Sequence, residues 1–297
     1  MSKKKAKQEL RKVDQSHYNV WQTLYMALYS SKLYIDVSKR WKGFGILYVF
    51  LLLALAAIPL STRVIIDYAH YFDQEIIYPL ESLPPLYIQK GQVKLEKKIE
   101  STNPYLVKNS QGKTVAIIDT TGAMKEIDKK KYPDLSILIT KNELHVSVKQ
   151  PQLFFTQDRP STATDLVQSF NKDDNEVFIG KDWVQTSGMV QLKWVPMLLV
   201  YPIIVMFFFV IYYSLFLILA FLGQVFAKVF FDMRLYYKQA CRIFAVAATG
   251  QVYFFFLMMT TGNLFTGLGL VYVAIMTVYF SYAIVSIKRG SNKMVLS

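Results

Sequence analysis

The sequence predicts an integral membrane protein with four transmembrane helices and an extracytoplasmic α+β domain, rich in sheet, inserted between helices 1 and 2. Three observations predict this class. Three long stretches carry no charged side chain, the segment between the first two alternates like β-strands, and the excess positive charge lies on one side of the expected spans. At 297 residues the chain is long enough for about two ordinary domains, one in the membrane and one outside.

The first charge-free stretch covers residues 43–62 and is rich in Leu and Ala. A hydrocarbon core of about 30 Å requires roughly 20 apolar residues in a helix, so this stretch predicts the first span. Residues 1–42 are polar and basic, and no small-residue cleavage pattern follows the span. We therefore expect a first span that stays in the protein rather than a cleaved signal peptide.

The second charge-free stretch covers residues 194–227. As one helix it would be about 50 Å long, which exceeds one bilayer thickness but is too short for two spans and a turn. We expect one long or tilted span with a kink at Pro202.

The third stretch runs from Ile243 to Ile287 and would reach about 68 Å as a single helix, more than twice the bilayer core. It must therefore fold back. Its most polar and turn-like point is Thr260-Thr261-Gly262-Asn263. The expected spans are residues 243–261 and 266–287.

Lys and Arg in the flanking segments predict which side faces the cytoplasm. Segments 1–42, 228–242 and 288–297 lie on one side and hold ten, four and three basic residues, against four acidic ones. The remaining segments, mainly 63–193, hold 17 basic and 17 acidic residues. The net charge of +13 thus lies on one side, which predicts a multi-pass protein of the cytoplasmic (inner) membrane with both termini cytoplasmic. Because topology explains this charge, we expect no nucleic-acid partner.

Residues 17–41 precede the first span and carry apolar residues at positions 21, 24, 25, 28 and 29. This spacing predicts an amphipathic helix. With its lysines and aromatic side chains it would lie on the anionic inner leaflet, which makes the lipid bilayer an expected partner of this basic N-terminal segment. A cytoplasmic helix packed on the protein's own bundle explains the pattern equally well.

Residues 63–193 form the expected extracytoplasmic domain. The domain opens with helical spacing of apolar residues and then changes to strand-like alternation. A second helix is expected from about Ser161, on the spacing of Leu166, Val167 and Phe170. Strands are expected in a hairpin around residues 90–92, in an apolar run at 115–119, and as a pair within 135–149.

Histidine is the first residue type to weigh for chemistry, and it occurs at His17, His70 and His145. His70 lies at helical spacing from Asp67 and Asp73, which permits a metal or pH-sensing site. No second histidine lies within ligand spacing. We therefore expect no metal there.

Residues 119–122, Asp-Thr-Thr-Gly, follow an apolar strand and resemble the Asp-Thr-Gly loop of aspartic proteases. The extra threonine breaks that loop, and no second copy supplies the other aspartate of a dyad. We expect a tight turn capped by Asp119. A further acidic run lacks the spacing of a calcium loop and predicts a solvated loop: Asp173, Asp174, Glu176 and Asp182.

The expected spans contain no charged side chain, which argues against an ion-driven transporter. Gln251 is a candidate for a hydrogen bond across helices, with Tyr279 or Tyr282, although simple helix packing is the favoured interpretation. The one cysteine, Cys241, excludes an internal disulfide framework and is expected to be buried and structural.

Several short motifs carry a family resemblance: Ser30-Ser31-Lys32-Leu33-Tyr34, Ile58-Pro59, Pro85-Leu86-Tyr87-Ile88-Gln89-Lys90-Gly91-Gln92-Val93, Ile117-Ile118-Asp119-Thr120-Thr121-Gly122, and Tyr236-Tyr237-Lys238-Gln239-Ala240 before Ala248-Thr249. Together they resemble the bacterial membrane family known as domain of unknown function 1189, over most of the chain. Some of its members are named maltodextrin utilisation protein. The loop 150–190 and the turn at Asn263 match nothing specific, and the resemblance implies no catalytic residue.

We therefore assign no catalytic, cofactor-binding or metal-binding residue. The leading hypothesis is a non-enzymatic membrane protein that acts as accessory, sensor or scaffold through its outer domain, with envelope proteins, the cell wall or a solute as partner. A second is a component of a solute transport system, with carbohydrate as one candidate solute. A third is a membrane-embedded hydrolase, for which Asp119 and His70 are the best candidates.

Overall fold

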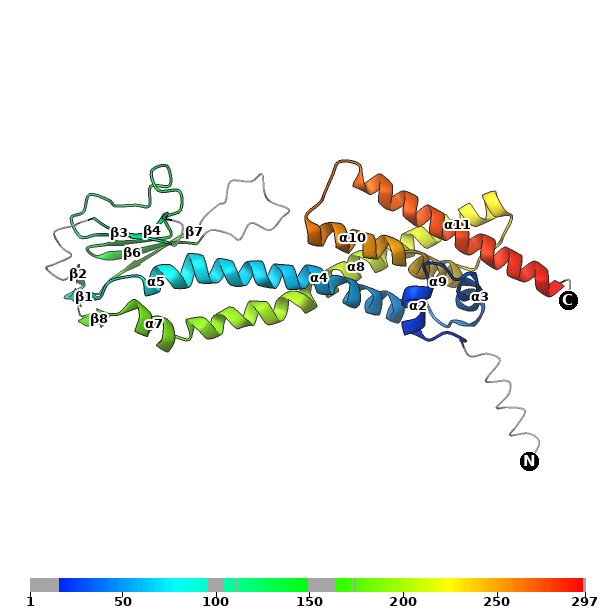
Figure 1. Cartoon of the computed structure of the whole chain (residues 1–297), viewed down its shortest axis with the longest axis horizontal. Coiled ribbons are helices and arrows are strands. Elements are labelled where there is room, and N and C mark those ends of the chain that lie inside the picture. The colour runs from blue at the N-terminus through cyan, green and yellow to red at the C-terminus, as the bar shows by residue number, and fades with distance from the viewer. Residues whose placement is uncertain are drawn as a thin grey trace, which may run out of the picture. The chain divides into compact units, whose positions relative to one another are not determined.

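The computed structural model describes residues 16–95, 104–109, 112–148, 164–171, 173 and 175–295. The chain divides into two compact units (Figure 1). We call residues 1–63 together with 200–297 the helical unit, and residues 64–199 the sheet unit.

Three described helices are long and apolar enough to cross a membrane, and the number rises to four if one bent helix pair counts as a span. The first, α4 (Ile46–Phe72), continues through a π-helical turn, η1 (Asp73–Ile77), into α5 (Tyr78–Glu81). The second, α8 (Met189–Phe231), is one continuous helix through Pro202. The third, α11, covers Leu268–Val295. These helices overlap residues 43–62, 194–227 and 266–287, the first, second and last spans that the sequence predicts.

The bent pair consists of α9 (Tyr237–Ala247) and α10 (Thr249–Thr261), which meet at 42°. The hydroxyl of Thr249 donates a 2.6 Å hydrogen bond to the carbonyl oxygen of Val246. A threonine that bonds to the backbone of the preceding turn bends a helix, because its hydroxyl competes with the helical ladder. Thr249 therefore accounts for the bend between α9 and α10.

The predicted fold-back between the last two apolar segments is confirmed. α10 ends at Thr261, and Gly262 follows in the left-handed conformation with a φ of 74°. Glycine adopts this conformation without steric cost, so it suits the residue that ends a helix. Arg63 of α4 donates to the carbonyl oxygen of Thr260, and so satisfies one of the carbonyls left open at the end of α10.

The single amphipathic helix expected before the first span is instead two helices, α2 (Val20–Met26) and α3 (Ser31–Arg40). The break follows Met26, and Tyr34 of α3 donates a 2.7 Å hydrogen bond to the carbonyl oxygen of Ala27 within it. α3 packs on α9 and α11 and buries Leu33, Tyr34 and Val37. α3 thus packs on the protein's own bundle, whereas Trp21 and Tyr25 of α2, and Tyr29 in the turn after it, are exposed.

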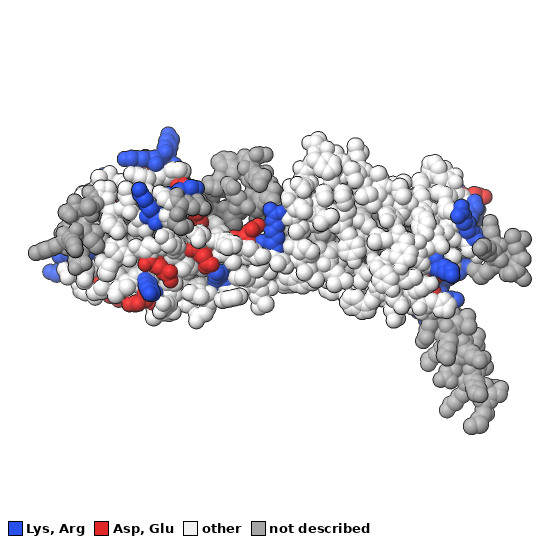
Figure 2. Space-filling view, viewed as in Figure 1, with Lys and Arg blue, Asp and Glu red and all other residues white. Residues whose placement is uncertain are grey.

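The surface of the helical unit is uncharged over a wide area in Figure 2. Lys and Arg side chains gather at the end that carries α3 and the C-terminal part of α11. An uncharged surface with basic residues at one end is typical of helices that cross a bilayer.

The sheet unit contains two sheets. The smaller sheet is antiparallel and has the order β2 (Gln92–Lys94), β1 (Leu86–Gln89), β8 (Glu176–Phe178). The larger has the order β3 (Tyr105–Lys108), β4 (Thr114–Asp119), β5 (Ile137–Thr140), β6 (Glu143–Val148), β7 (Thr164–Ser169). Only β4 and β5 pair in parallel in this sheet, and residues 120–136 connect them. The expected hairpin, the strand at 115–119 and the strand pair at 135–149 are confirmed.

Both sheets contribute to one hydrophobic core, in which Leu86 and Val93 of the smaller sheet are buried with Ile118 and Ile139 of the larger one. A second cluster covers the opposite face of β4 and β5, where Ile117 and Leu138 pack beneath side chains of the connecting segment: Met124, Ile127 and Tyr132. A short helix, α7 (Gly180–Thr186), packs on α5. Gly180 is required there, because a Cβ atom would lie 1.8 Å from the carbonyl oxygen of Leu80.

The helix expected from about Ser161 is wrong for the described part of that segment, because residues 164–169 form strand β7. Val167 pairs with His145 of β6, and Leu166 pairs with Val146. Adjacent residues of a strand point to opposite faces, so Leu166 and Val167, which helical spacing would place near each other, separate across the sheet. Pairing with β6 outweighs the local pattern. Ser161 itself lies outside the described residues.

Candidate functional site

The smaller sheet presents one face to solvent, and we call it the Tyr87 face. Alternation along β1 buries Leu86 in the core and turns Tyr87 outward, with 38% of its surface exposed. Val177 of β8, which is 56% exposed, pairs with Tyr87 on one side, and Lys94 of β2 pairs with it on the other. The face consists of Tyr87, Gln89, Gln92, Lys94 and Val177.

The turn between β1 and β2 fixes one end of the Tyr87 face. Lys90 and Gly91 both have positive φ, of 50° and 71°, which is the geometry of a two-residue hairpin turn. A Cβ atom on Gly91 would lie 2.7 Å from the carbonyl oxygen of Asn171, so only glycine fits without rearrangement. The backbone N–H of Lys90 donates a 3.1 Å hydrogen bond to Oδ1 of Asn175, which ties the turn to the segment before β8.

A shallow groove of about 590 Å³ lies along this face. Its lining combines the exposed ring of Tyr87 and the side chain of Val177 with amide groups and three charged residues. Two of these, Lys90 and Lys94, are positive, and Glu176 is negative. Nζ of Lys94 donates a 3.0 Å hydrogen bond to Oε1 of Gln89, which orders both side chains. An exposed aromatic ring among amides can stack on a flat or extended ligand and hydrogen-bond it at the same time. The Tyr87 face is therefore equipped for recognition.

Asp119 forms the predicted capped turn. Its carboxylate accepts hydrogen bonds from the backbone N–H of Thr121 at 2.8 Å and of Met124 at 2.6 Å, and from the Thr121 hydroxyl. Burial by itself would raise the pKa of Asp119, but the bonds from Thr121, Met124 and Gly122 lower that pKa below its ordinary value. The side chain is fully buried and stabilises the start of the connection between β4 and β5.

Two of the histidine and aspartate candidates of the sheet unit, Asp73 and His145, each lie beside another ionisable side chain. Asp73 forms an ion pair with Lys193, at 2.7 and 2.8 Å from Nζ to the two carboxylate oxygens. His145 lies on β6, where its Nε2 is 3.1 Å from Oε2 of Glu143. Within the described ranges no group of three or more His, Cys, Asp or Glu side chains could hold a metal ion. The spacing of His70 with its neighbouring aspartates therefore does not build such a group there.

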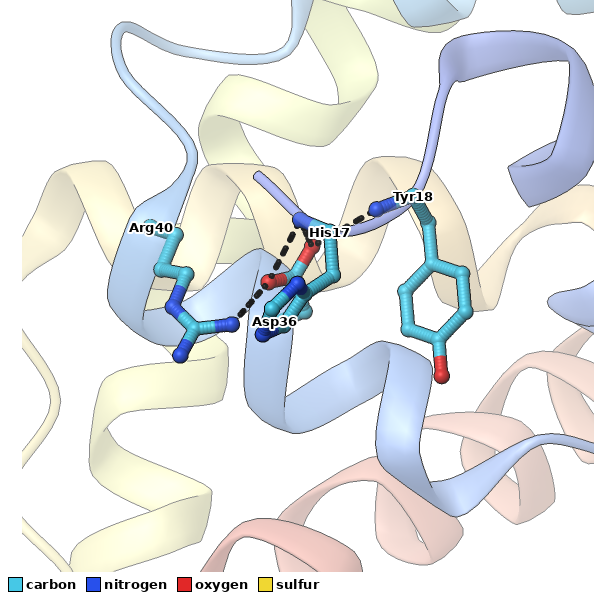
Figure 3. A network of polar contacts seen from close by, with 4 residues as sticks. All are labelled: His17, Tyr18, Asp36 and Arg40. Atoms are coloured by element: carbon cyan, nitrogen blue, oxygen red, sulfur yellow. Dashed lines mark hydrogen bonds and ion pairs between the residues drawn. The ribbon is translucent and has the colours of Figure 1, made fainter. Parts of the chain in front are cut away.

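His17 contributes its backbone rather than its imidazole to a polar network in the helical unit. Its N–H lies 3.1 Å from each carboxylate oxygen of Asp36, and the N–H of Tyr18 lies 3.5 Å from one of them. Arg40, one turn along α3, pairs with the same carboxylate at 3.2 Å (Figure 3). Asp36 is only 5% exposed, so these partners compensate a buried negative charge. The network fixes the segment that leads into α2.

The remaining candidates are structural or exposed. Cys241 is buried, as expected. Tyr282 donates its hydroxyl to the carbonyl oxygen of Tyr29 at 2.8 Å rather than to Gln251. Gln251 is buried, and its Oε1 has no hydrogen-bond partner among the residues that the structure describes. Of the acidic run, Asp173 and Glu176 are exposed and Asp182 lies in the first turn of α7, while Asp174 lies outside the described residues.

Sequence alternation identifies the outward residues of β1 and β2 but not the third strand of this face. Val177 lies about 90 residues from Tyr87 in a three-residue strand, which is too short for a periodic signal. Its contribution becomes visible only through the pairing of β8 with β1.

Comparison with protein-family models matches residues 21–284 to a family described as a protein of unknown function, DUF1189. The match covers most of the chain and confirms the resemblance seen in the short motifs. No curated protein and no solved structure matches the chain.

Proposed function

Because the chain belongs to the DUF1189 family of proteins of unknown function, which has no stated activity to carry over, we propose a function from the chain's own features: a non-enzymatic, multi-pass protein of the cytoplasmic membrane that acts as an accessory, sensor or scaffold through an extracytoplasmic sheet unit. The proposal includes four spans, with the bent pair α9–α10 as the third. Its partner is a component of the cell envelope.

One observation supports the role of the sheet unit most directly: the exposed Tyr87 and Val177 side chains lie next to each other on the outer face of the smaller sheet. The groove beside them carries amides and both signs of charge. Interfaces are enriched in aromatic side chains near their centre and carry polar groups at their rim. We therefore propose the Tyr87 face as the surface that contacts the envelope partner.

Charge and aromatic side chains support the proposed orientation. The segments beside the helices on one side carry the whole net charge of +13, which favours the cytoplasm for the chain termini and for residues 232–236 between α8 and α9. On the same side, Trp21 and Tyr25 of α2 and Tyr29 in the turn after it are exposed. We propose that this aromatic face of α2 lies in the headgroup region of the anionic inner leaflet.

Site-specific photo-crosslinking tests the proposed contact in whole cells. A photoreactive phenylalanine analogue replaces Tyr87 in the full chain, and the matched control replaces Leu106 of β3, which is 39% exposed against 38% for Tyr87. Position 87 should give a discrete adduct with another envelope component, and position 106 should give none. The same adduct from both positions, or none from position 87, would reject the Tyr87 face as the contact surface.

Cysteine accessibility tests the orientation independently. In a Cys241→Ser background, a cysteine at Lys130 of the sheet unit should react with a membrane-impermeant maleimide in intact cells. A cysteine at Asp232, between α8 and α9, should react only after the membrane is opened. The reverse pattern would place the sheet unit in the cytoplasm and overturn the topology.

A transport role receives less support from the helical unit. The hydroxyl groups of Tyr48, Thr277 and Tyr282 all form hydrogen bonds within the protein. They act in packing rather than as the polar lining of a solute path. Reconstituted full-length protein should accordingly give no solute uptake into liposomes, and uptake of any sugar above that of empty liposomes would favour transport instead.

A further inference from the structure

The helical unit contains a pocket of about 400 Å³ lined by residues of α8, α9, α10 and α11. Its floor includes the stacked rings of Phe244 and Phe280, whose centroids lie 4.0 Å apart. Gly223 of α8 lies against this stack, and a Cβ atom there would come within 2.1 Å of the Phe244 ring. The absence of a side chain on Gly223 thus lets α8 approach the rings closely. We call this cavity the Gln251 pocket.

The Gln251 pocket opens onto an apolar surface. Leu215, Leu222 and Val273 line it and are 40%, 55% and 65% exposed. These residues belong to α8 and α11, two of the helices with the length and composition of membrane spans. In a bilayer, such an opening faces hydrocarbon rather than water. The molecules with direct access to the pocket are therefore lipids.

Two residues that line the pocket each carry a polar atom without a partner. Oε1 of Gln251 and the hydroxyl of Tyr272 are buried, and neither has a hydrogen bond to any described residue. A buried polar group without a partner costs about 1–3 kcal/mol, and no water is at hand in hydrocarbon to offset that cost. Each atom has almost no accessible surface, so it reaches a ligand only after its side chain rotates. The terminal torsion of glutamine is broad and permits such a rotation. Both groups are suited to a ligand that brings its own polar atom.

The chemistry of the two groups specifies that atom. The Gln251 oxygen only accepts a hydrogen bond, so the ligand must donate one, while the Tyr272 hydroxyl can donate to the ligand in return. A ligand hydroxyl meets both requirements. None of the described residues that line the pocket is charged, so a carboxylate or phosphate placed there would be buried without a counter-ion. Charge complementarity therefore selects a neutral ligand.

We propose that the Gln251 pocket binds a neutral long-chain lipid alcohol, with the hydrocarbon chain against the Phe244–Phe280 stack and the hydroxyl between Gln251 and Tyr272. Diacylglycerols and polyprenols share this chemistry. The site is separate from the Tyr87 face and does not depend on the role proposed for the sheet unit.

Photo-labelling of the full-length protein in lipid nanodiscs tests the proposal. Three diazirine probes of equal chain length are compared: a long-chain alcohol, the corresponding carboxylic acid, and the hydrocarbon without a polar group. The alcohol should label the α11 segment around Tyr272 most strongly. Competition by unlabelled diacylglycerol or by polyprenol then distinguishes the two natural sources. Equal labelling by the acid or by the hydrocarbon would overturn the proposal.

Variants separate the polar contact from simple packing. Gln251→Leu and Tyr272→Phe should each reduce labelling by the alcohol about fivefold, as expected for the loss of one hydrogen bond. Labelling by the hydrocarbon should not change. Thr277→Val is the matched control in the same pocket, because its hydroxyl already donates to the Val273 carbonyl oxygen. Thermal unfolding of each variant identifies loss of fold, and unchanged alcohol labelling in folded Tyr272→Phe would contradict the assignment.

Discussion

The hydroxyl of Tyr48 lies 2.6 Å from Oγ1 of Thr249, so α4 and α10 are joined at the point where the third apolar segment bends. Thr249 donates its own proton to the Val246 carbonyl oxygen. Tyr48 is therefore the donor in the contact between the helices. One pair of side chains thus links the bend of α9–α10 to the first long helix.

Tyr48→Phe should destabilise the helical unit by about 1 kcal/mol, the usual size of a side-chain hydrogen bond between membrane helices. Thermal unfolding in detergent measures the change, with Tyr25→Phe, at an exposed position of α2, as the control that should be neutral. In a double-mutant cycle, Tyr48→Phe and Thr249→Val should be less costly together than the two separate losses added. Strict additivity would show that the contact contributes nothing.

Asp119→Asn should destabilise the sheet unit by about 1–3 kcal/mol, because the amide accepts fewer of the hydrogen bonds that the carboxylate receives. Since the pKa of Asp119 is lowered in the folded state, its contribution is fully present above the unfolded pKa and is lost as the pH falls through the folded value. Pulse proteolysis of the full chain at pH 7 and in acid measures both effects. Asp173→Asn, at an exposed position, is the control.

Asp36→Ala should release the segment before α2, because both backbone N–H groups that it binds would lose their acceptor. Limited proteolysis of the purified protein should then cut near residues 16–19 much faster than in the native chain. His17→Ala should leave the cleavage rate unchanged, because the imidazole is not the group that Asp36 binds. Equal sensitivity of the two variants would refute this account of the network.

Asp73→Asn should change the free energy of unfolding by less than about 1 kcal/mol, because its partner Lys193 binds it at an exposed position. The small effect should vanish in high salt.

A metal-chelating agent should leave the melting temperature of the protein unchanged. A lower melting temperature after chelation would indicate a metal at the His70 helix face and revive that hypothesis.

The long helices could be predicted because a span in lipid requires about 20 successive residues without charge. Such runs can be identified directly in the sequence. The end of α10 at Gly262 could also be predicted, since the left-handed conformation found there favours glycine. The bend at Thr249 could not be predicted, because threonine also occurs in straight helices. Only the hydrogen bond from Thr249 to the Val246 carbonyl oxygen reveals its effect. Likewise, the break between α2 and α3 depends on Tyr34 reaching the carbonyl of Ala27, which periodicity does not record.

In the sheet unit, local alternation predicted the hairpin around Gly91, the strand at 115–119 and the strand pair within 135–149. It did not predict β3, β7 or β8. β7 was expected to be helical because Leu166 and Val167 fit both periods, and β8 is only three residues long. The sequence therefore predicted the residues of the Tyr87 face on β1 and β2 but not Val177 on β8. The sequence did not predict the Gln251 pocket, because whether the Gln251 oxygen has a hydrogen-bond partner depends on how the helices pack.

The network around Asp36 has a consequence for how this part of the chain can diverge in evolution. The groups bound at positions 17 and 18 are backbone amides, which every residue except proline supplies. Substitution should therefore be nearly free at those two positions, with proline as the exception. Position 36 must keep a carboxylate. Related sequences that differ at positions 17 and 18 should therefore still carry an acidic residue at position 36 in α3.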